Sequence, residues 1–184
     1  MGISLWHLSQ GNATYAQNWL ANNLLHTAWL RTQASGRQVK PWPWASTWPL
    51  ARLFVPHLNA EQIILSNTSN NGVSSFALGH IDTSVLPGEA GNSVLYAPPQ
   101  TYVNFLRRLN KGDEIVLESL YSGQWRYRVA AINVVHKTST DLLKSTSDRR
   151  LTVVSCYPCQ GEISNLRYVV IAEEVERIAH TSTP

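Results

Sequence analysis

The N-terminal part of the chain follows a helical pattern of apolar positions. These positions are Tyr15, Trp19, Leu20, Leu24, Ala28 and Trp29. Thr14 can cap such a helix and Gly36 can end it. The pattern predicts one amphipathic helix from Asn12 to Gly36 that packs its tryptophan face on the rest of the domain. A helix lying on a membrane surface is the less favoured alternative, because the polar face has almost no Lys or Arg.

The next segment, Pro41–Pro49, is rich in proline and tryptophan. Its prolines deny the backbone the hydrogen bonds of a helix or a sheet ladder. We therefore predict an extended linker that packs against the domain through its tryptophans. These are Trp42, Trp44 and Trp48.

Beyond the linker, short apolar runs rich in β-branched residues alternate with turn residues. The runs are Ala51–Val55, Gln62–Leu65, Val94–Ala97, Glu114–Leu120, Arg126–Val135, Leu151–Cys156 and Arg167–Val175. One short helix is predicted at Tyr102–Leu109, between two of these strands. The pattern as a whole predicts an all-β barrel or sandwich.

The composition is that of a folded chain. Of 184 residues, 43% are apolar and 15% charged, which suits one compact unit with a sizeable core. We divide it into a helical segment, 1–39, and a β domain, 40–184. No run reaches the ~18 consecutive apolar residues of a membrane span, and the start lacks the order of a signal peptide. We expect the chain as given to be soluble.

The charge does not indicate a nucleic-acid partner. Fifteen Lys and Arg against twelve Asp and Glu give a net charge of +3. The basic residues are scattered in pairs rather than gathered in one cluster, and nucleic-acid binding usually needs a stronger cluster. We expect no nucleic acid to bind.

Both cysteines lie in one motif, Cys156-Tyr157-Pro158-Cys159. This spacing fits a redox dithiol, half of a zinc site, or a catalytic thiol with an incidental neighbour. Zinc needs about four ligands, and the sequence has no second Cys pair or closely spaced His pair. A redox motif of the thioredoxin kind opens a helix, whereas this pair ends a predicted strand. A catalytic thiol is therefore favoured over a zinc site or a redox dithiol.

Arg167 stands eleven positions after Cys156, at the start of the next predicted strand. Antiparallel neighbours lie about 5 Å apart, so the guanidinium can reach the sulfur. A cation there favours the thiolate and can donate hydrogen bonds to a carbonyl oxygen that becomes negative. The alternative is that Arg167 only pairs with Glu173, with Glu174 or with the C-terminal end of a strand, and the residues alone leave both interpretations open.

Two segments, Leu151–Pro158 and Leu166–Val170, resemble the cysteine strand and the arginine strand of the sortase transpeptidases. More narrowly, the chain resembles the sortases of marine and other Gram-negative proteobacteria. Further motifs follow the order of that group along nearly the whole chain. They are Lys40–Trp44, Trp48-Pro49, Ala51–Leu53, Gly79-His80, Pro87-Gly88, Gly91–Ser93, Phe105-Leu106 and Lys111–Asp113.

The resemblance implies an eight-stranded β-barrel with short connecting helices and an N-terminal helix. It makes Cys156 the nucleophile that attacks a backbone carbonyl of a C-terminal sorting signal of the LPxTG kind and forms a thioester. An amine, whose identity the sequence does not give, then resolves the thioester. Arg167 would hold the carbonyl or the oxyanion, and Ser155, where many relatives carry Thr, would offer a hydroxyl to the substrate.

The resemblance also implies a partner and a location, and no cofactor. The partner would be a surface protein with a sorting signal. The natural protein would be anchored at the inner membrane, with this domain in the periplasm.

The chain departs from the family pattern at the catalytic histidine. Counting back from Phe105-Leu106 places Pro98 there, and proline has no side-chain proton to give. General acid catalysis supplies roughly 10²–10⁴-fold, so transpeptidation should be crippled unless another residue acts. His57, His80 and His136 are the candidates, and His80 is preferred because a Gly-His stands here in relatives. Otherwise His80 is a structural residue bonded to a loop.

Cys159 is the second departure, since relatives usually carry an aromatic residue there. In an oxidising periplasm its thiol could close on Cys156 and switch the nucleophile off. Alternatively, Cys159 is only a small apolar replacement. The leading function is a sortase-type transpeptidase. The alternatives are a pseudo-enzyme that binds the signal without cleaving it and, more distantly, a thiol redox protein.

Overall fold

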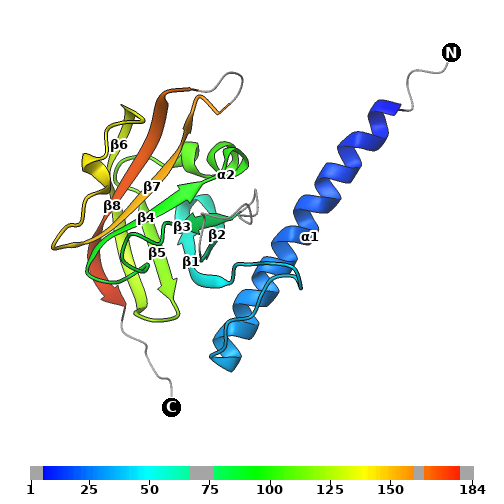
Figure 1. Cartoon of the computed structure of the whole chain (residues 1–184), viewed down its shortest axis with the longest axis horizontal. Coiled ribbons are helices and arrows are strands. Elements are labelled where there is room, and N and C mark those ends of the chain that lie inside the picture. The colour runs from blue at the N-terminus through cyan, green and yellow to red at the C-terminus, as the bar shows by residue number, and fades with distance from the viewer. Residues whose placement is uncertain (1–5, 67–76, 160–163, 179–184) are drawn as a thin grey trace.

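The computed structural model of the chain describes residues 6–66, 77–159 and 164–178. Within these ranges, the side chains of residues 6–18 and 102 are not described. A β-barrel and a long helix make up the molecule (Figure 1). The strands are β1 (Pro49–Val55), β2 (Ala60–Leu65), β3 (Leu78–His80), β4 (Gly91–Ala97), β5 (Glu114–Ser119), β6 (Gly123–His136), β7 (Arg149–Tyr157) and β8 (Leu166–Ile178).

The eight strands close in the order β1-β2-β3-β4-β7-β8-β6-β5. The predicted mainly β, eight-stranded barrel with an N-terminal helix is confirmed. All seven strands predicted from apolar runs are present, with ends that differ by a few residues. β3 was not predicted, because a strand of three residues carries too little alternation to stand out.

The barrel interior is filled by inward-facing side chains. In β5, buried and half-buried residues alternate, which is the period of a strand with one face on a core. The largest buried members of this core include Leu53, Leu95, Leu117 and Tyr127. Closure of the sheet removes the free edges that an open sheet would present.

Short helices connect the strands. Between β4 and β5, α2 (Pro99–Asn104) begins at a proline in the first helical position, where the missing N–H costs nothing. A 3₁₀ turn (Leu106–Arg108) follows it. The helix predicted at Tyr102–Leu109 therefore starts earlier and is interrupted at Phe105, whose backbone is not helical. Two more 3₁₀ turns are Pro56–Leu58 and Asp141–Leu143.

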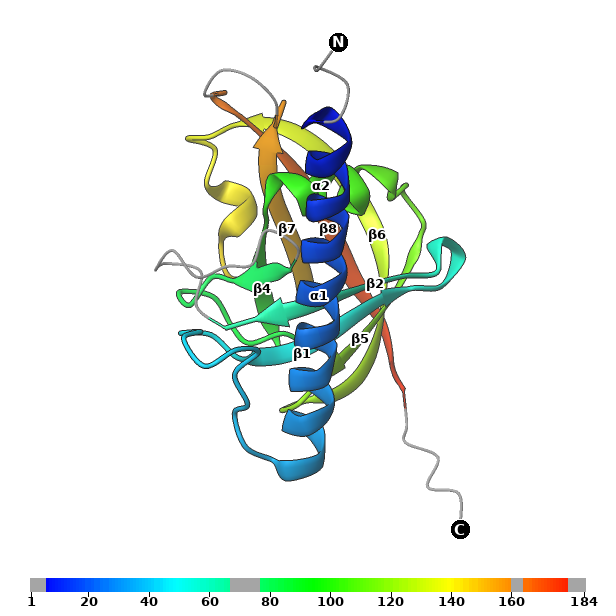
Figure 2. The same cartoon turned by 90° about the vertical axis from the view of Figure 1, so that its right-hand side faces the viewer.

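The N-terminal helix α1 (Trp6–Ser35) is longer than predicted, and only its C-terminal part packs on the barrel. Leu25 and Trp29 are buried against residues of β2 that face outward. Trp19 is 69% exposed and Leu20 is also exposed, because the N-terminal half of the helix diverges from the barrel (Figure 1). Figure 2 shows the helix running across the face of the barrel that carries β1 and β2. The prediction that the whole tryptophan face packs is therefore wrong for Trp19 and Leu20. No helix in the described ranges is both long and apolar enough to cross a membrane.

The proline-rich segment joins α1 to β1 and packs only in part. Trp42 lies against the cluster that holds Leu25 and Trp29, and Trp48 is half-buried. Trp44 is 84% exposed, so the prediction that all three tryptophans pack is wrong at this position. Pro43, next to it, is also exposed, which indicates that this turn of the segment faces solvent.

Candidate active site

The antiparallel pairing of β7 with β8 places Cys156 directly opposite Arg167. Residues paired in this way point to the same face of the sheet, with Cβ atoms about 4.5–5.5 Å apart. Both side chains are half-buried. The register thus places the two residues opposite each other on neighbouring strands, as the sequence predicts.

Hydrogen bonds orient the Arg167 side chain at the start of β8. Its Nη1 donates to the carbonyl oxygens of Ser164, at 3.1 Å, and Leu166, at 2.8 Å. The two carboxylates considered as alternative partners bind other cations, since Glu173 pairs with Arg150 and Glu174 with Arg149. Among the described residues, Arg167 therefore has no ion pair with either glutamate.

Ser155 fixes β7 to its other neighbour, β4. Its side chain is fully buried, and Oγ donates a hydrogen bond of 2.7 Å to the carbonyl oxygen of Ala97. Oγ also lies 3.9 Å from the sulfur of Cys156 and 3.6 Å from that of Cys159. The hydroxyl is thus inside the protein, beneath the two sulfurs. Because it is buried there, nothing in the structure supports the predicted contact between Ser155 and a bound peptide.

Pro98 occupies the position beside Cys156 on the β4 side. β4 and β7 run parallel, with Ala97 opposite Ser155, so the residues that follow are also neighbours. The spacing of paired strands is about 4.8 Å. Pro98 is buried and begins the turn into α2. Extended by one residue beyond the end of β4, this register aligns Pro98 with Cys156 and Arg167 in one row. Pro98 carries no group that can transfer a proton.

The family model of the sortase domain matches residues 53–175 of this chain, which is more than half of its length. The chain belongs to the sortase family. It is 28% identical to Sortase D of Bacillus subtilis (strain 168) over 126 residues, which are 67% of this chain and 62% of that protein. The chain thus spans less than two thirds of the length of this relative.

Solved sortase structures have the same fold. A Clostridium perfringens Sortase D5 transpeptidase superposes with a TM-score of 0.65 at 17% identity, covering 85% of this chain and 99% of the other. A lid mutant of sortase A from Corynebacterium diphtheriae gives 0.62 at 20% identity, covering 93% and 98%. At these identities the likeness concerns the barrel itself.

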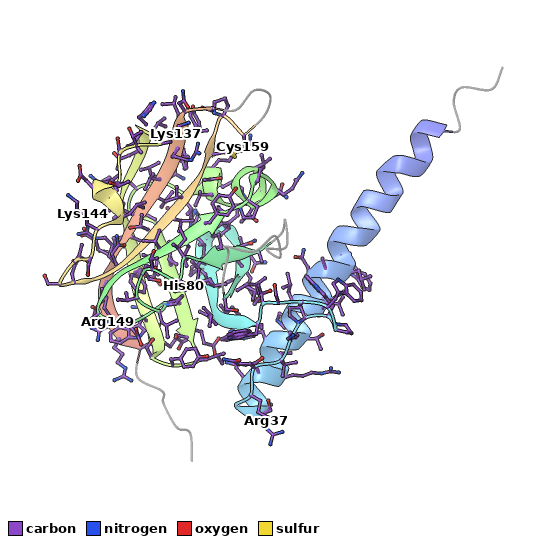
Figure 3. All side chains as sticks on the ribbon, viewed as in Figure 1. Arg37, His80, Lys137, Lys144, Arg149 and Cys159 are labelled. Carbon is purple, nitrogen blue, oxygen red and sulfur yellow. A yellow bond between two sulfur atoms is a disulfide. The ribbon has the colours of Figure 1, made fainter. Side chains whose placement is uncertain are left out.

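His80 does not lie near Cys156 in this sortase-family chain. It pairs with Leu95 of β4, which pairs with Val153 of β7, three residues before the cysteine. Two strand spacings and three residues of rise separate the Cα atoms by about 14 Å. Figure 3 shows His80 and Cys159 in different parts of the barrel.

Hydrogen bonds also hold the His80 imidazole in place. The side chain is buried, with 3% exposed, and Nε2 lies 2.9 Å from the carbonyl oxygen of Val85 and 3.2 Å from Ser84 Oγ. This is the structural role, bonded to a loop, that the sequence left as the alternative. We assign no catalytic role to His80.

The other two candidate histidines are not in the row either. Nε2 of His57 lies 3.4 Å from a carboxylate oxygen of Asp113. His57 is in the turn that follows β1, and β1 is on the side of the barrel opposite β7. His136 ends β6 and contacts Thr138 Oγ1 at 2.8 Å. By register it is nearer to Cys156, about 10 Å between Cα atoms, but alternation points it to the other face of the sheet.

A disulfide joins Cys156 to Cys159. β7 ends at Tyr157, and the chain then turns so that the Cα atoms of the two cysteines are 5.0 Å apart. Of the two interpretations of Cys159, the structure shows closure on Cys156. A sulfur held in a disulfide is not a thiolate, which is the nucleophilic form of cysteine.

Two cavities lie elsewhere on the described surface. One, of about 450 Å³, lies between α1 and β2 and is lined by His26, Glu61 and Gln62 among others. A second, of about 200 Å³, lies over β1 and β5. Neither is the peptide-sized cleft that the sequence predicts at Cys156, which stays a prediction. The described residues contain no group of three or more His, Cys, Asp or Glu side chains that could hold a metal.

Proposed function

We propose that this chain is a sortase-type cysteine transpeptidase in which Cys156 carries the acyl group. The observation that carries the proposal is the direct pairing of Cys156 with Arg167 on a sortase barrel. The similar Clostridium perfringens protein is described as a transpeptidase, which supports the same class of reaction here. The proposed substrate is a C-terminal sorting signal of the LPxTG kind.

In the proposed reaction, the Cys156 thiolate attacks the carbonyl carbon of the peptide bond and forms a tetrahedral oxyanion. Arg167 donates hydrogen bonds to that oxygen. A guanidinium has five N–H donors, and the two hydrogen bonds to carbonyl oxygens use only Nη1. The C–N bond then breaks, the leaving amine takes up a proton, and a thioester remains. An incoming amine attacks the thioester and releases the thiolate.

Ser155 has a positioning role in this proposal. Its hydrogen bond to the Ala97 carbonyl joins the ends of β4 and β7 where Cys156 stands. Because the side chain is fully buried, we do not propose that it binds the peptide directly.

Pro98 makes the proposed enzyme slow. The leaving amine must gain a proton as the tetrahedral intermediate collapses, and in the family pattern a histidine at this position gives it. In this chain the proton comes from water. General acid catalysis is worth roughly 10²–10⁴-fold, or about 3–5 kcal/mol of barrier, and that contribution is missing.

One alternative function rests on the proline that takes the place of the family histidine. A sortase-like protein that binds a sorting signal without cleaving it needs no acid, so a proline beside Cys156 and three histidines outside the row also suit a binding protein. The two functions differ in whether a covalent bond forms at Cys156.

The proposed partner is a surface protein with a sorting signal, and the proposed location is the periplasmic face of the inner membrane of a proteobacterium, with an anchor. The disulfide supports this compartment, because disulfides persist in the periplasm and are rare in the cytosol.

Product analysis tests the proposal. The reduced protein is incubated with a peptide that contains an LPxTG-like signal and with an amine such as triglycine, and products are identified by mass. We expect a peptide joined to the amine, formed slowly, and none with Cys156→Ala. Tight binding of the peptide by the reduced protein, with neither product nor adduct, supports the binding protein and contradicts the transpeptidase.

A further inference from the structure

The sulfur that the proposed reaction needs is held in a covalent bond. A thiolate is the nucleophilic form of cysteine, and Cys156 in the disulfide has none to offer. Cys159 has no part in the acyl-transfer steps described above. Its sulfur is bonded to the sulfur of Cys156 and lies 3.6 Å from Ser155 Oγ.

We propose that Cys159 is a reversible redox lock on Cys156, opened by thiol–disulfide exchange with a dithiol protein or a small thiol. The inference rests on the proposed function, because the disulfide can switch off activity only if Cys156 is the nucleophile. The oxidised protein is inactive, and the reduced protein is the transpeptidase.

The disulfide is reduced in two thiol–disulfide exchange steps. A reductant thiolate attacks Sγ of Cys159, the bond between the two protein sulfurs breaks, and Cys156 leaves as a thiolate. A second reductant thiolate then attacks the reductant sulfur of the mixed disulfide, and Cys159 leaves and takes up a proton. Two electrons pass to the protein, and two reductant thiols become one disulfide.

The surroundings of the two sulfurs give the exchange a direction. Arg167 is opposite Cys156 in the strand register, on the same face of the sheet. A cation near a sulfur stabilises it as a thiolate. The sulfur that forms the more stable thiolate is the better leaving group, so attack at Cys159 is favoured over attack at Cys156. The exchange therefore delivers Cys156 as the free thiolate beside the cation it needs for catalysis.

The disulfide is also accessible. Cys156 and Cys159 are both half-buried, and Pro158 between them is exposed. Ser155 Oγ lies beneath the two sulfurs, so the open side faces away from the core. A thiol in solution can thus reach the bond without unfolding of the barrel. While closed, the bond also protects the nucleophile from irreversible oxidation to sulfinic acid.

Alkylation of the folded protein tests the lock without any substrate. Oxidised protein is treated with iodoacetamide, with and without prior dithiothreitol, and the modified residues are found by peptide mass. We expect alkylation of Cys156 to rise about tenfold or more after reduction. In Cys159→Ser, Cys156 should react equally with and without reductant. Two free thiols in the untreated wild type, or a bond that reacts only after denaturation, would overturn the proposal.

Peptide cleavage then separates the lock from the proposed function. We expect wild type to cleave only after reduction, and Cys159→Ser to cleave at the rate of reduced wild type in either buffer. If alkylation behaves as predicted but neither reduced protein forms product or adduct, the lock stands and the transpeptidase proposal fails. If reduced wild type cleaves and Cys159→Ser does not, Cys159 takes part in the chemistry, and its assignment as a lock is overturned.

Discussion

Replacing Pro98 by histidine should restore the missing proton donor. Pro98 follows Ala97, the last residue of β4, and the β4–β7 register extended by one residue aligns it with Cys156. Its backbone, with φ −59° and ψ 161°, is in a region that all L-residues adopt. The residue before a proline is restricted to that region, and Pro99 follows, so histidine should keep the same backbone.

The expected gain follows from the chemistry, and the expected cost follows from burial. A positioned general acid contributes roughly 10²–10⁴-fold. We expect the low end, about 10²-fold in kcat, because the rest of the site has not been selected to orient an imidazole at this position. Pro98 is buried, so the larger side chain should lower the free energy of unfolding by about 1–3 kcal/mol.

The assay is the rate of peptide cleavage by reduced protein, compared with Pro98→Gln. Glutamine also enlarges the side chain at this buried position but cannot act as an acid at neutral pH, so it controls for overpacking. Urea unfolding confirms that both variants are folded. We expect only the histidine variant to gain rate. Equal rates in the two folded variants would refute the reasoning that a lost acid at position 98 limits this protein.

Four further predictions concern single residues. Arg167→Ala should lower kcat/KM for cleavage by about 10²–10³-fold through loss of oxyanion stabilisation. Arg167→Lys should be less affected, and circular dichroism should show that both variants are folded. An unchanged rate would exclude the assigned role. Ser155→Ala should lower the free energy of unfolding by about 1–3 kcal/mol, because a buried carbonyl loses its partner, and Ser155→Thr should recover much of it in urea unfolding. His80→Ala should leave the cleavage rate of the folded protein unchanged, and a fall of more than about tenfold would give His80 a place in the chemistry. Trp29→Ala should lower the free energy of unfolding, measured in urea, by about 3–5 kcal/mol. Trp44→Ala should lower it by less than about 0.5 kcal/mol. Equal losses in the two variants would mean that α1 does not pack on the barrel as the structure shows.

The sequence was most informative where local pattern and geometry agree. Strands alternate between buried and exposed sides, so most of the barrel could be predicted from apolar runs. The pairing of Cys156 with Arg167 was predictable because a short connection between two strands leaves few registers for them. β3 was missed because its pairing with β2 and β4 is a long-range property that three residues do not encode locally.

Burial of individual side chains was harder to predict. Trp19 and Trp44 have the apolar character of core residues, yet the helix diverges from the barrel (Figure 1) and the linker leaves Trp44 exposed. His80 has the right neighbours in sequence, but register places it three residues along the barrel from the level of Cys156 and two strands away. Such distances depend on how all eight strands align, which no single motif reveals.

The central claim is that Cys156, beside Arg167, accepts an acyl group from a peptide. Intact-mass measurement of Cys159→Ser after brief incubation with an LPxTG-like peptide, in the absence of added amine, tests this most directly. We predict a mass increase equal to the N-terminal part of the peptide, located at Cys156, removed by hydroxylamine and absent from the Cys156→Ala variant. Saturable binding of the peptide with no mass increase at any time would contradict it.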